Sequence, residues 1–259
     1  MKRGDVAVFS ISAVLGVVAA AAATFSVFVL DREPSSAAIS QGADSSLLVI
    51  TWAPTFCKVT PDNRGCASGQ VGEMGPTFIL HGLWPQPPKL QYCGLPAGLA
   101  DRVHQGKRDL PPVELNDEVR QDVQEVLSSA DLMVPHEWYT HGTCSGVTPD
   151  EYFGDAAALT REARQVLDPL FIAAQGDRIA LNTIRDSFDD AFGPGAGERV
   201  ALSCRDVPDT GAVVYEMLLS LPPADELATA DGSLSLGPLL LAGPPVPSHC
   251  PGGAVPSSA

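Results

Sequence analysis

Four apolar runs, two near each end of the predicted domain, have the length and composition of β-strands. Residues 46–52 are β-branched and apolar and predict a first strand, and residues 76–80 predict a second strand that ends just before His81. Residues 199–204 and 211–220 are separated by a short polar turn and predict a hairpin. Strands are therefore expected at both ends of the domain.

The stretches between these strands have the periodicity of helices. Apolar residues recur at helical spacing in residues 115–129 and again in residues 182–192. A third helix is expected to begin after Thr148, because a threonine cap, a proline and two acidic residues are typical of a helix start. The pattern predicts an α+β fold, in which helices pack on a central antiparallel sheet.

The polar segment PHEWYTHGTC at residues 135–144 is the strongest candidate for chemistry. Pro135 suits the first position of a helix and Gly142 a natural end, which predicts a short helix. Since each helical residue advances ~100° around the axis, four polar side chains would share one face. They are His136, Glu137, Thr140 and His141. Such a face could supply a general acid and base, three zinc ligands, or only a solvated polar surface.

A second segment, HGLWP at residues 81–85, follows the predicted strand at 76–80. His81 is expected at the tip of that strand, where a glycine and a proline would turn the chain beside Trp84. Together the segments HGLWP and HEWYTHGTC closely resemble the two active-site segments of the ribonuclease T2 family. Members of that family are endoribonucleases that cleave single-stranded RNA without a metal.

The resemblance implies a role for each residue that matches these motifs. His81 would be the general base and His141 the general acid, while His136 and Glu137 would hold and stabilise the phosphate. Trp84 matches a position that stacks a nucleobase. Taken singly, each residue has a structural alternative, such as a hydrogen-bonding histidine at a strand end or an ordinary core tryptophan. His104 and His249 lie outside both motifs and are expected on the surface.

Two positions depart from the family pattern. Thr140 stands where the family usually has a lysine beside the phosphate, and Gln86 stands where an acidic residue often follows HGLWP. Thr140 is expected at the substrate, but as a weaker donor, and Gln86 puts the base preference in doubt. The competing hypothesis is a module that binds RNA or protein and has lost useful turnover.

Composition limits the mode of RNA binding and the number of domains. The 259 residues carry a formal net charge of −15, which argues against the broad basic surface that non-specific duplex binding requires. We expect local contacts to single-stranded RNA, one catalytic domain at residues 46–222 and a monomer. Residues 223–259 are expected to form a tail rich in proline, glycine and serine, with its last ten residues disordered.

The amino terminus predicts export. Lys2 and Arg3 precede an uncharged apolar stretch at residues 6–30, which is long enough to span a bilayer. A membrane anchor within residues 1–30 is favoured, and a cleaved signal peptide is the alternative. Residues 31–45 are expected to be a disordered linker. The body of the protein is therefore expected outside the cytoplasm, either membrane-anchored or secreted.

Six cysteines fit an oxidising compartment. Fifteen pairings are possible in principle, and the order along the chain with the family resemblance favours Cys57–Cys66, Cys93–Cys144 and Cys204–Cys250. A Cys/His zinc site is the competitor, but the chain has no CxxC spacing. Because the resemblance is to metal-free enzymes, no metal and no cofactor are expected.

Overall fold

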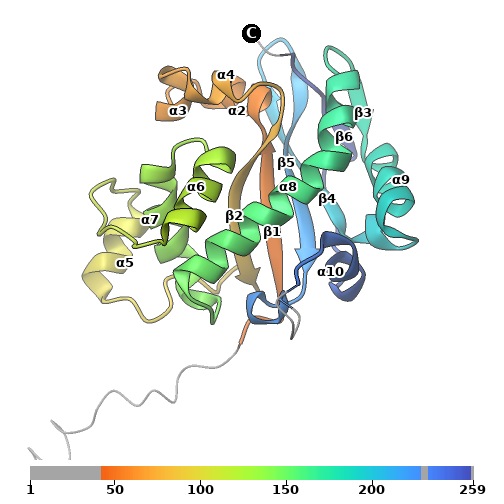
Figure 1. The fold of residues 1–259 in the computed structure, drawn as a ribbon. Helices are drawn as coiled ribbons and strands as arrows, with labels where there is room; N and C mark the ends of the chain where they lie inside the picture. Colours follow the sequence, from red (N-terminus) through yellow and green to blue (C-terminus); the bar gives the residue numbers. More distant parts are fainter. Residues whose placement is uncertain (1–41, 229–232, 258–259) are drawn as a thin grey trace, which may run out of the picture. The chain divides into compact units, whose positions relative to one another are not determined.

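A computed structural model describes residues 42–228 and 233–257, and the strands in these residues form one six-stranded sheet (Figure 1). The order is β2-β1-β5-β6-β3, and β4 pairs with β5. Neighbouring strands are antiparallel except for the parallel pair β5 and β6. The strands are β1 (Ser45–Trp52), β2 (Phe78–Gln86), β3 (Arg178–Ala180), β4 (Val200–Val207), β5 (Gly211–Leu221) and β6 (Gly252–Ala254). The predicted α+β fold is confirmed, with a mixed sheet.

One face of the sheet carries the main hydrophobic core. Helix α8 (Pro149–Ala173) runs across this face (Figure 1). It begins at a capping box in which Thr148 and Glu151 satisfy each other's backbone N–H groups. Alternate strand residues such as Ile50, Phe78 and Leu80 pack in this core. Three further helices contribute to it, namely α6 (Asp117–Val126), α9 (Leu181–Phe192) and α10 (Leu236–Ala242).

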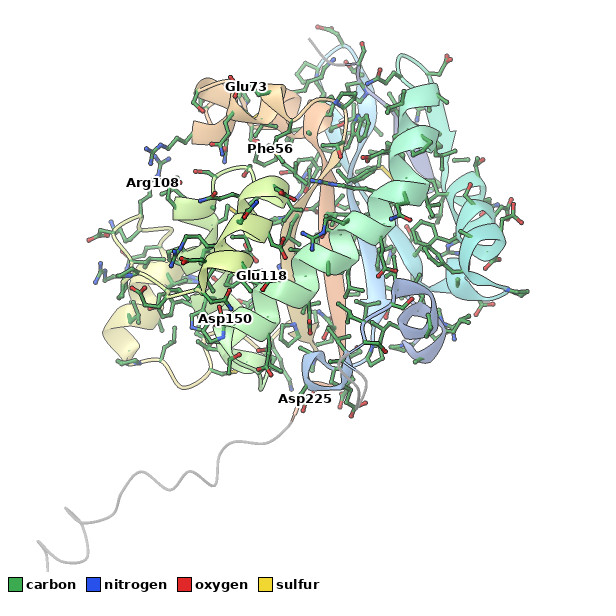
Figure 2. The ribbon with its side chains drawn as sticks, viewed as in Figure 1. Phe56, Glu73, Arg108, Glu118, Asp150 and Asp225 are labelled. Carbon is green, nitrogen blue, oxygen red and sulfur yellow. A yellow bond between two sulfur atoms is a disulfide. The ribbon has the colours of Figure 1, made fainter. Side chains whose placement is uncertain are left out.

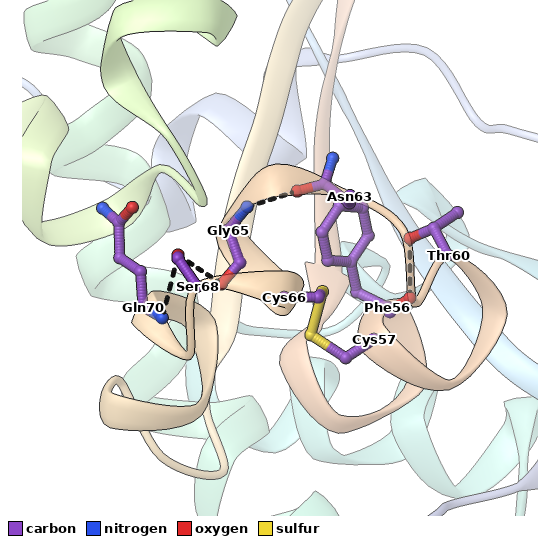
Figure 3. The surroundings of a disulfide bond; sticks show 8 residues. All are labelled: Phe56, Cys57, Thr60, Asn63, Gly65, Cys66, Ser68 and Gln70. Atoms are coloured by element: carbon purple, nitrogen blue, oxygen red, sulfur yellow. Dashed lines mark hydrogen bonds between the residues drawn. A yellow bond between two sulfur atoms is a disulfide. The ribbon is translucent and has the colours of Figure 1, made fainter.

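The residues between these core positions point to the opposite face, where shorter helices lie. Ile79 packs there with Ala53 and Val71, and Phe56 packs against this small cluster (Figure 2). The disulfide Cys57–Cys66 joins the first two of these helices (Figure 3). The helices are α2 (Ala53–Val59), α3 (Arg64–Ala67) and α4 (Gln70–Glu73). The remaining helical segments are α5 (Ala97–His104), α7 (Ala130–Thr140), η3 (Gly142–Cys144), η4 (Ala196–Arg199) and η5 (Ala224–Glu226).

Two β-bulges interrupt the alternation of the strands. In β2, Leu80 pairs with Ile50 and Gly82 pairs with Val49, so His81 is an extra residue. In β5, Tyr215 is the extra residue, because Val214 pairs with Cys204 and Glu216 pairs with Ser203. A bulge turns two consecutive side chains toward one face and is frequent beside active sites. Both bulges therefore change the direction of side chains on the face opposite α8.

The second strand is longer than the sequence predicted. Residues 76–80 were expected to form a strand with His81 at its tip, but β2 continues to Gln86 and His81 lies inside it. Pro85 is tolerated because β2 pairs along its length only with β1 among the described residues, which makes it an edge strand. The bulge, rather than a turn, aims His81 out of the sheet.

The expectation of a disordered carboxyl-terminal end was wrong for residues 250–257. Strand β6 pairs with β3, and the Pro256 carbonyl accepts a hydrogen bond from the buried Trp52 indole at 3.3 Å. Cys250 is tied to Cys204, and the structure contains all three of the expected disulfides. The sequence did not predict β3 and β6, because strands of only three residues are too short to show an alternating pattern.

The expected membrane anchor at residues 6–30 lies outside the described residues, as does most of the expected linker. Within residues 42–228 and 233–257, no helix is both long and apolar enough to cross a bilayer.

Candidate active site

The site is formed on the face of the sheet opposite α8, where β2 and β5 meet α7. His81 on β2 is held by two carboxylates from different elements. Its Nδ1 lies 2.8 Å from Glu216 Oε1 on β5, and its Nε2 lies 3.8 Å from Glu137 Oε1 on α7. The carboxylate of Glu216 can only accept, so the hydrogen bond requires a proton on Nδ1. The side chain of His81 remains 30% exposed and can meet a substrate.

Glu137 is buried against β2 at a position that only glycine can provide. A Cβ on Gly82 would lie 2.0 Å from Glu137 Oε2, so any larger residue would displace the carboxylate. The bulge turns Gly82 toward the same face as His81. Trp84, the next residue of β2 on this face, donates its indole N–H to Glu137 Oε2 at 3.1 Å. The motif HGLWP thus places an imidazole, a residue without a side chain and an indole donor along one strand.

Helix α7 carries His136, Glu137 and Thr140, but it is not the short helix that the sequence predicted. It begins at Ala130, and Pro135 lies in its interior rather than at its first position. A proline there removes one backbone hydrogen bond and costs about 3 kcal/mol or more. The helix does end at Thr140, immediately before the loop with Gly142. His136 Nε2 lies 3.8 Å from Glu137 Oε1, so one carboxylate oxygen lies between two imidazoles.

His141 follows the last residue of α7 and is almost fully buried. Its ring stacks on Trp84, with centroids 5.1 Å apart and an interplanar angle of 23°. Its Nδ1 has no hydrogen-bond partner within the described chain. The disulfide Cys93–Cys144 fixes the segment just after it, and the Tyr92 N–H donates to the Thr140 carbonyl at 3.0 Å. His141 is therefore positioned by stacking and by its backbone.

The two histidines have opposite electrostatic environments. Burial by itself would lower the pKa of His81, but the hydrogen bond that the ring donates to Glu216 and the charges of Glu137 and Glu216 outweigh burial and raise the pKa. Burial, with the positive charges of His136 and His81, lowers the pKa of His141 to about 3. Burial also raises the pKa of Glu137. The site therefore favours a protonated His81 beside a neutral His141.

The remaining residues of the two motifs are less directly placed for substrate. Thr140 is buried, and its hydroxyl has no partner among the described residues. Gln86 donates its side-chain amide to the Trp84 carbonyl at 3.1 Å. His104 and His249 are exposed, as expected.

Sequence reasoning missed the residues that β4 and β5 contribute. A small cavity of about 160 Å³ is lined by His81, His136 and Tyr215. Arg205 lies over the Tyr215 ring at 5.0 Å and opposes the protonation of His81. One signal was available for Glu216, because it is the only charged residue in the apolar run at 211–220. A carboxylate in such a strand is rarely buried without a partner.

Comparison with known proteins identifies the family. The model of the ribonuclease T2 family matches residues 43–224. The chain belongs to the ribonuclease T2 family. This match contains HGLWP and HEWYTHGTC as well as the hairpin of β4 and β5, so the site lies wholly inside the ribonuclease T2 region.

Relatives of the chain include two bacterial ribonucleases. A ribonuclease of Aeromonas hydrophila is 29% identical over 119 residues, which are 46% of each chain. Ribonuclease I of Escherichia coli (strain K12) is 26% identical over 210 residues, which cover 69% of this chain and 75% of that protein. The alignment with the Aeromonas protein thus spans about half of its length.

Two solved structures share the fold. RNase NT in complex with 5′-AMP has a TM-score of 0.51 at 19% identity, covering 83% of this chain and 99% of that chain. A mutant of RNase MC1 in complex with 5′-UMP has a TM-score of 0.50 at 21% identity, covering 75% of this chain and 92% of that chain.

Proposed function

We propose that this protein is an endoribonuclease that cleaves single-stranded RNA by attack of the ribose 2′-hydroxyl on the adjacent phosphate, without a metal. The observation that carries the proposal is the pair His81 and His141, whose rings each lie 5.1 Å from the Trp84 ring and whose pKa values are shifted in opposite directions. The reaction needs one group to take the 2′-hydroxyl proton and another to protonate the 5′-oxygen leaving group. A neutral and a protonated imidazole meet both needs.

The electrostatics favour roles that are the reverse of those first expected. His141, with its lowered pKa, is the base that accepts the 2′-hydroxyl proton as the O2′–P bond forms. His81, flanked by Glu216 and Glu137, is the acid that donates the Nε2 proton as the P–O5′ bond breaks. The products are a 2′,3′-cyclic phosphate and a free 5′-hydroxyl. Water then opens the cyclic ester to a 3′-phosphate, with the two histidines exchanging roles.

His136 and Glu137 are proposed to stabilise the phosphate. His136 lines the same cavity as His81 and is 42% exposed at its side chain, so its ring can meet an incoming oxygen. Glu137 Oε1 lies 3.8 Å from the Nε2 atom of each ring, and its charge helps to raise the pKa of His81. Donors and charges fixed before the substrate arrives stabilise the phosphorane without reorganisation.

The second candidate function is an RNA-binding module with little turnover. Thr140 favours it, because the lysine that the family usually places at this position is missing. The buried and hydrogen-bonded Glu137 opposes it, since the carboxylate is held close to both imidazoles in a space that exists only because residue 82 has no Cβ.

We infer that the domain is exported, as a monomer, and that the amino-terminal segment is either an anchor or a signal peptide. Three disulfides and the absence of any free cysteine in the described chain support an oxidising compartment. The substrate is proposed to be RNA in single strands, because a net charge of −15 disfavours attraction to a duplex.

The test uses the full chain, single-stranded RNA and excess EDTA. We expect cleavage with 2′,3′-cyclic phosphate ends that convert to 3′-phosphate ends. Cleavage that stops in EDTA, or 5′-phosphate products, would overturn the reaction type. RNA binding without cleavage would support the second candidate.

A further inference from the structure

Resting on the proposed function, we propose that Glu216 is a positioning residue that holds the His81 ring with its Nε2 proton directed at the leaving oxygen. The two side chains come from strands far apart in the sequence, separated by 135 positions, yet lie 2.8 Å apart. Strand β1 lies between β2 and β5. Glu216 therefore reaches across a neighbouring strand to make this one contact.

The bulge in β5 is what makes the contact possible. Val214 and Met217 both face the hydrophobic core, and regular alternation would not place both on one side with two residues between them. The extra residue Tyr215 corrects the register, so that Glu216 faces the side of His81. A second bulge does the same for His81 on β2. The bulges in β2 and β5 together make the hydrogen bond between His81 and Glu216 possible.

The contact fixes both the tautomer and the charge of His81. A carboxylate accepts only, so the proton of a neutral His81 is held on Nδ1 and the ring orientation is set. The Glu216 side chain is only 8% exposed, and a charge so buried requires a partner. When His81 carries a second proton, that proton lies on Nε2, which has no closer acceptor within the described part of the chain than Glu137 Oε1 at 3.8 Å. It is free for transfer.

Other charged groups face His81 and set the conditions of the test. Glu137 also favours the protonated ring, whereas Arg205 on β4 disfavours it. Groups that face or adjoin the ring are Glu216 from β5, Glu137 and His136 from α7, Arg205 from β4, and His141 after α7. Replacing Glu216 alone leaves the other four in place, so the change in behaviour belongs to this carboxylate.

Glu216→Gln is the decisive variant because its amide oxygen can still accept from Nδ1 while the charge is removed. We expect kcat on RNA to fall by roughly tenfold to a hundredfold, which is less than the full ~10²–10⁴-fold contribution of a positioned acid because His81 itself remains. The alkaline limb of the kcat/KM profile should move to lower pH, and KM should change little. A substrate with a p-nitrophenolate leaving group needs no acid, so the variant should recover most of the wild-type rate on it.

Ser220→Ala is the matched control, because Ser220 is buried in the same strand four residues later. It should keep the wild-type rate and pH profile. Glu216→Asp keeps the carboxylate on a shorter side chain and so tests whether the charge must lie next to Nδ1. We expect its alkaline limb to lie between those of Glu216→Gln and the wild-type enzyme. A Glu216→Gln enzyme with the wild-type rate and profile, or equal loss on both substrates, would overturn the role proposed for the Glu216 carboxylate.

A measurement on the unmodified chain covers the case in which the variants fold poorly. Nitrogen NMR of the imidazoles above the His81 pKa should find the neutral ring protonated at Nδ1. Protonation at Nε2 would contradict the proposal. Absence of any RNA cleavage by the wild-type chain is a different result, because it would overturn the proposed function and leave the tautomer measurement as the test of the contact.

Discussion

Trp84 stacks on His141 at 5.1 Å while its indole N–H binds Glu137, so one side chain positions two members of the site. The family resemblance implied that this tryptophan stacks a nucleobase. In the structure, one face of its ring is already covered by His141, and the His81 ring meets it nearly edge-on at 5.1 Å and 74°. A nucleobase could stack only on the part of the Trp84 ring that the two histidines leave uncovered. The main structural role of Trp84 is to hold the site together.

Trp84→Phe should therefore lower turnover more than it lowers affinity for RNA. The substitution keeps a stacking face for His141 but leaves Glu137 Oε2 without its donor. A hydrogen bond to a charged group contributes about 1.5–3 kcal/mol, which corresponds to roughly tenfold to a hundredfold in rate if the loss falls on the transition state. Steady-state kinetics on a short RNA measure kcat and KM separately.

Trp138→Phe provides the control for this prediction. Trp138 packs edge-on against Tyr152 in the core at 5.8 Å and contributes no side-chain hydrogen bond to the site. It should lower thermal stability with little change in kcat. A Trp84→Phe enzyme that loses RNA affinity but keeps kcat would instead assign this residue to base stacking.

The pH dependence follows from the two histidines. Activity requires a neutral His141, so it should fall only as the pH drops toward the lowered pKa of that residue, which is about 3. It also requires a protonated His81, so it should fall as the pH rises through the raised pKa of that ring. The kcat/KM profile of the free enzyme should be bell-shaped and broad, with its acidic limb well below the ordinary histidine value.

His81→Ala and His141→Ala should each remove nearly all turnover, since a positioned acid or base contributes about 10²–10⁴-fold. RNA binding should survive better than rate. Activity above about a tenth of wild type in either variant would exclude that residue as a principal acid or base.

Gly82→Ala should abolish most activity by displacing Glu137. The added Cβ would lie 2.0 Å from Glu137 Oε2 and 2.7 Å from Trp84 Nε1, so the carboxylate or the indole must move. Overpacking of this kind costs about 1–3 kcal/mol. The matched control is Gly98→Ala in α5, where nothing lies within 4 Å of the new Cβ. Thermal melts and initial rates on both variants separate the effect on the site from a general effect of replacing glycine by alanine. If Gly82→Ala were as active as Gly98→Ala, the close contact between residue 82 and Glu137 would not matter for activity.

The sequence predicted the parts of the fold that have a strong local pattern. Thr148 and its neighbours specified the start of α8, and the two apolar runs near residues 200 and 220 specified the β4 and β5 hairpin. The first residue of α7 was missed because Pro135 is a better signal for a helix start than Ala130, and only packing overrides that preference. Strands of three residues have too few positions to show a period.

The sequence predicted only those residues of the site that belong to the two linear motifs. His81, His136, Glu137 and His141 lie in two segments whose residues are adjacent along the chain, so a motif can reveal them. Glu216 reaches these residues because of the strand order and the bulge in β5. Neither feature can be predicted from the residues that neighbour Glu216 in the sequence. The proposed exchange of the acid and base roles likewise rests on burial and on the two carboxylates around His81, which only the folded chain brings together.

Removing the disulfide Cys93–Cys144 should lower both stability and kcat. It closes a loop of 51 positions, which corresponds to about 4 kcal/mol in the chain-entropy model. It also fixes the segment that follows His141. The comparison is the pair Cys204–Cys250, whose separation of 46 predicts a similar loss of stability. Serine replacements of each pair should shift the denaturation midpoint alike, but only Cys93→Ser with Cys144→Ser should reduce kcat in the folded state.

Thr140 is the remaining departure from the family pattern, and its surroundings define the last prediction. It lies one turn after His136 and three residues after Glu137 on α7, and its hydroxyl is buried without a partner among the described residues. Glu137 Oε1 also lacks a hydrogen-bond donor there. A cation at residue 140 would therefore meet both an unsatisfied carboxylate oxygen and, during the reaction, the charge of the phosphorane.

Thr140→Lys should raise kcat at least about tenfold, because one preorganised donor to a developing charge is worth ~10²–10³ in rate. KM should change less, since the new charge acts mainly in the transition state. Thr140→Met is the control, because methionine has a similar length without charge and should match wild type or fall below it. Kinetics at several salt concentrations should find the gain of the lysine variant largest at low salt. If a folded Thr140→Lys enzyme shows no gain, another cation already serves the phosphate. Arg205, which lies over the ring of the cavity-lining Tyr215, would be the residue to replace next.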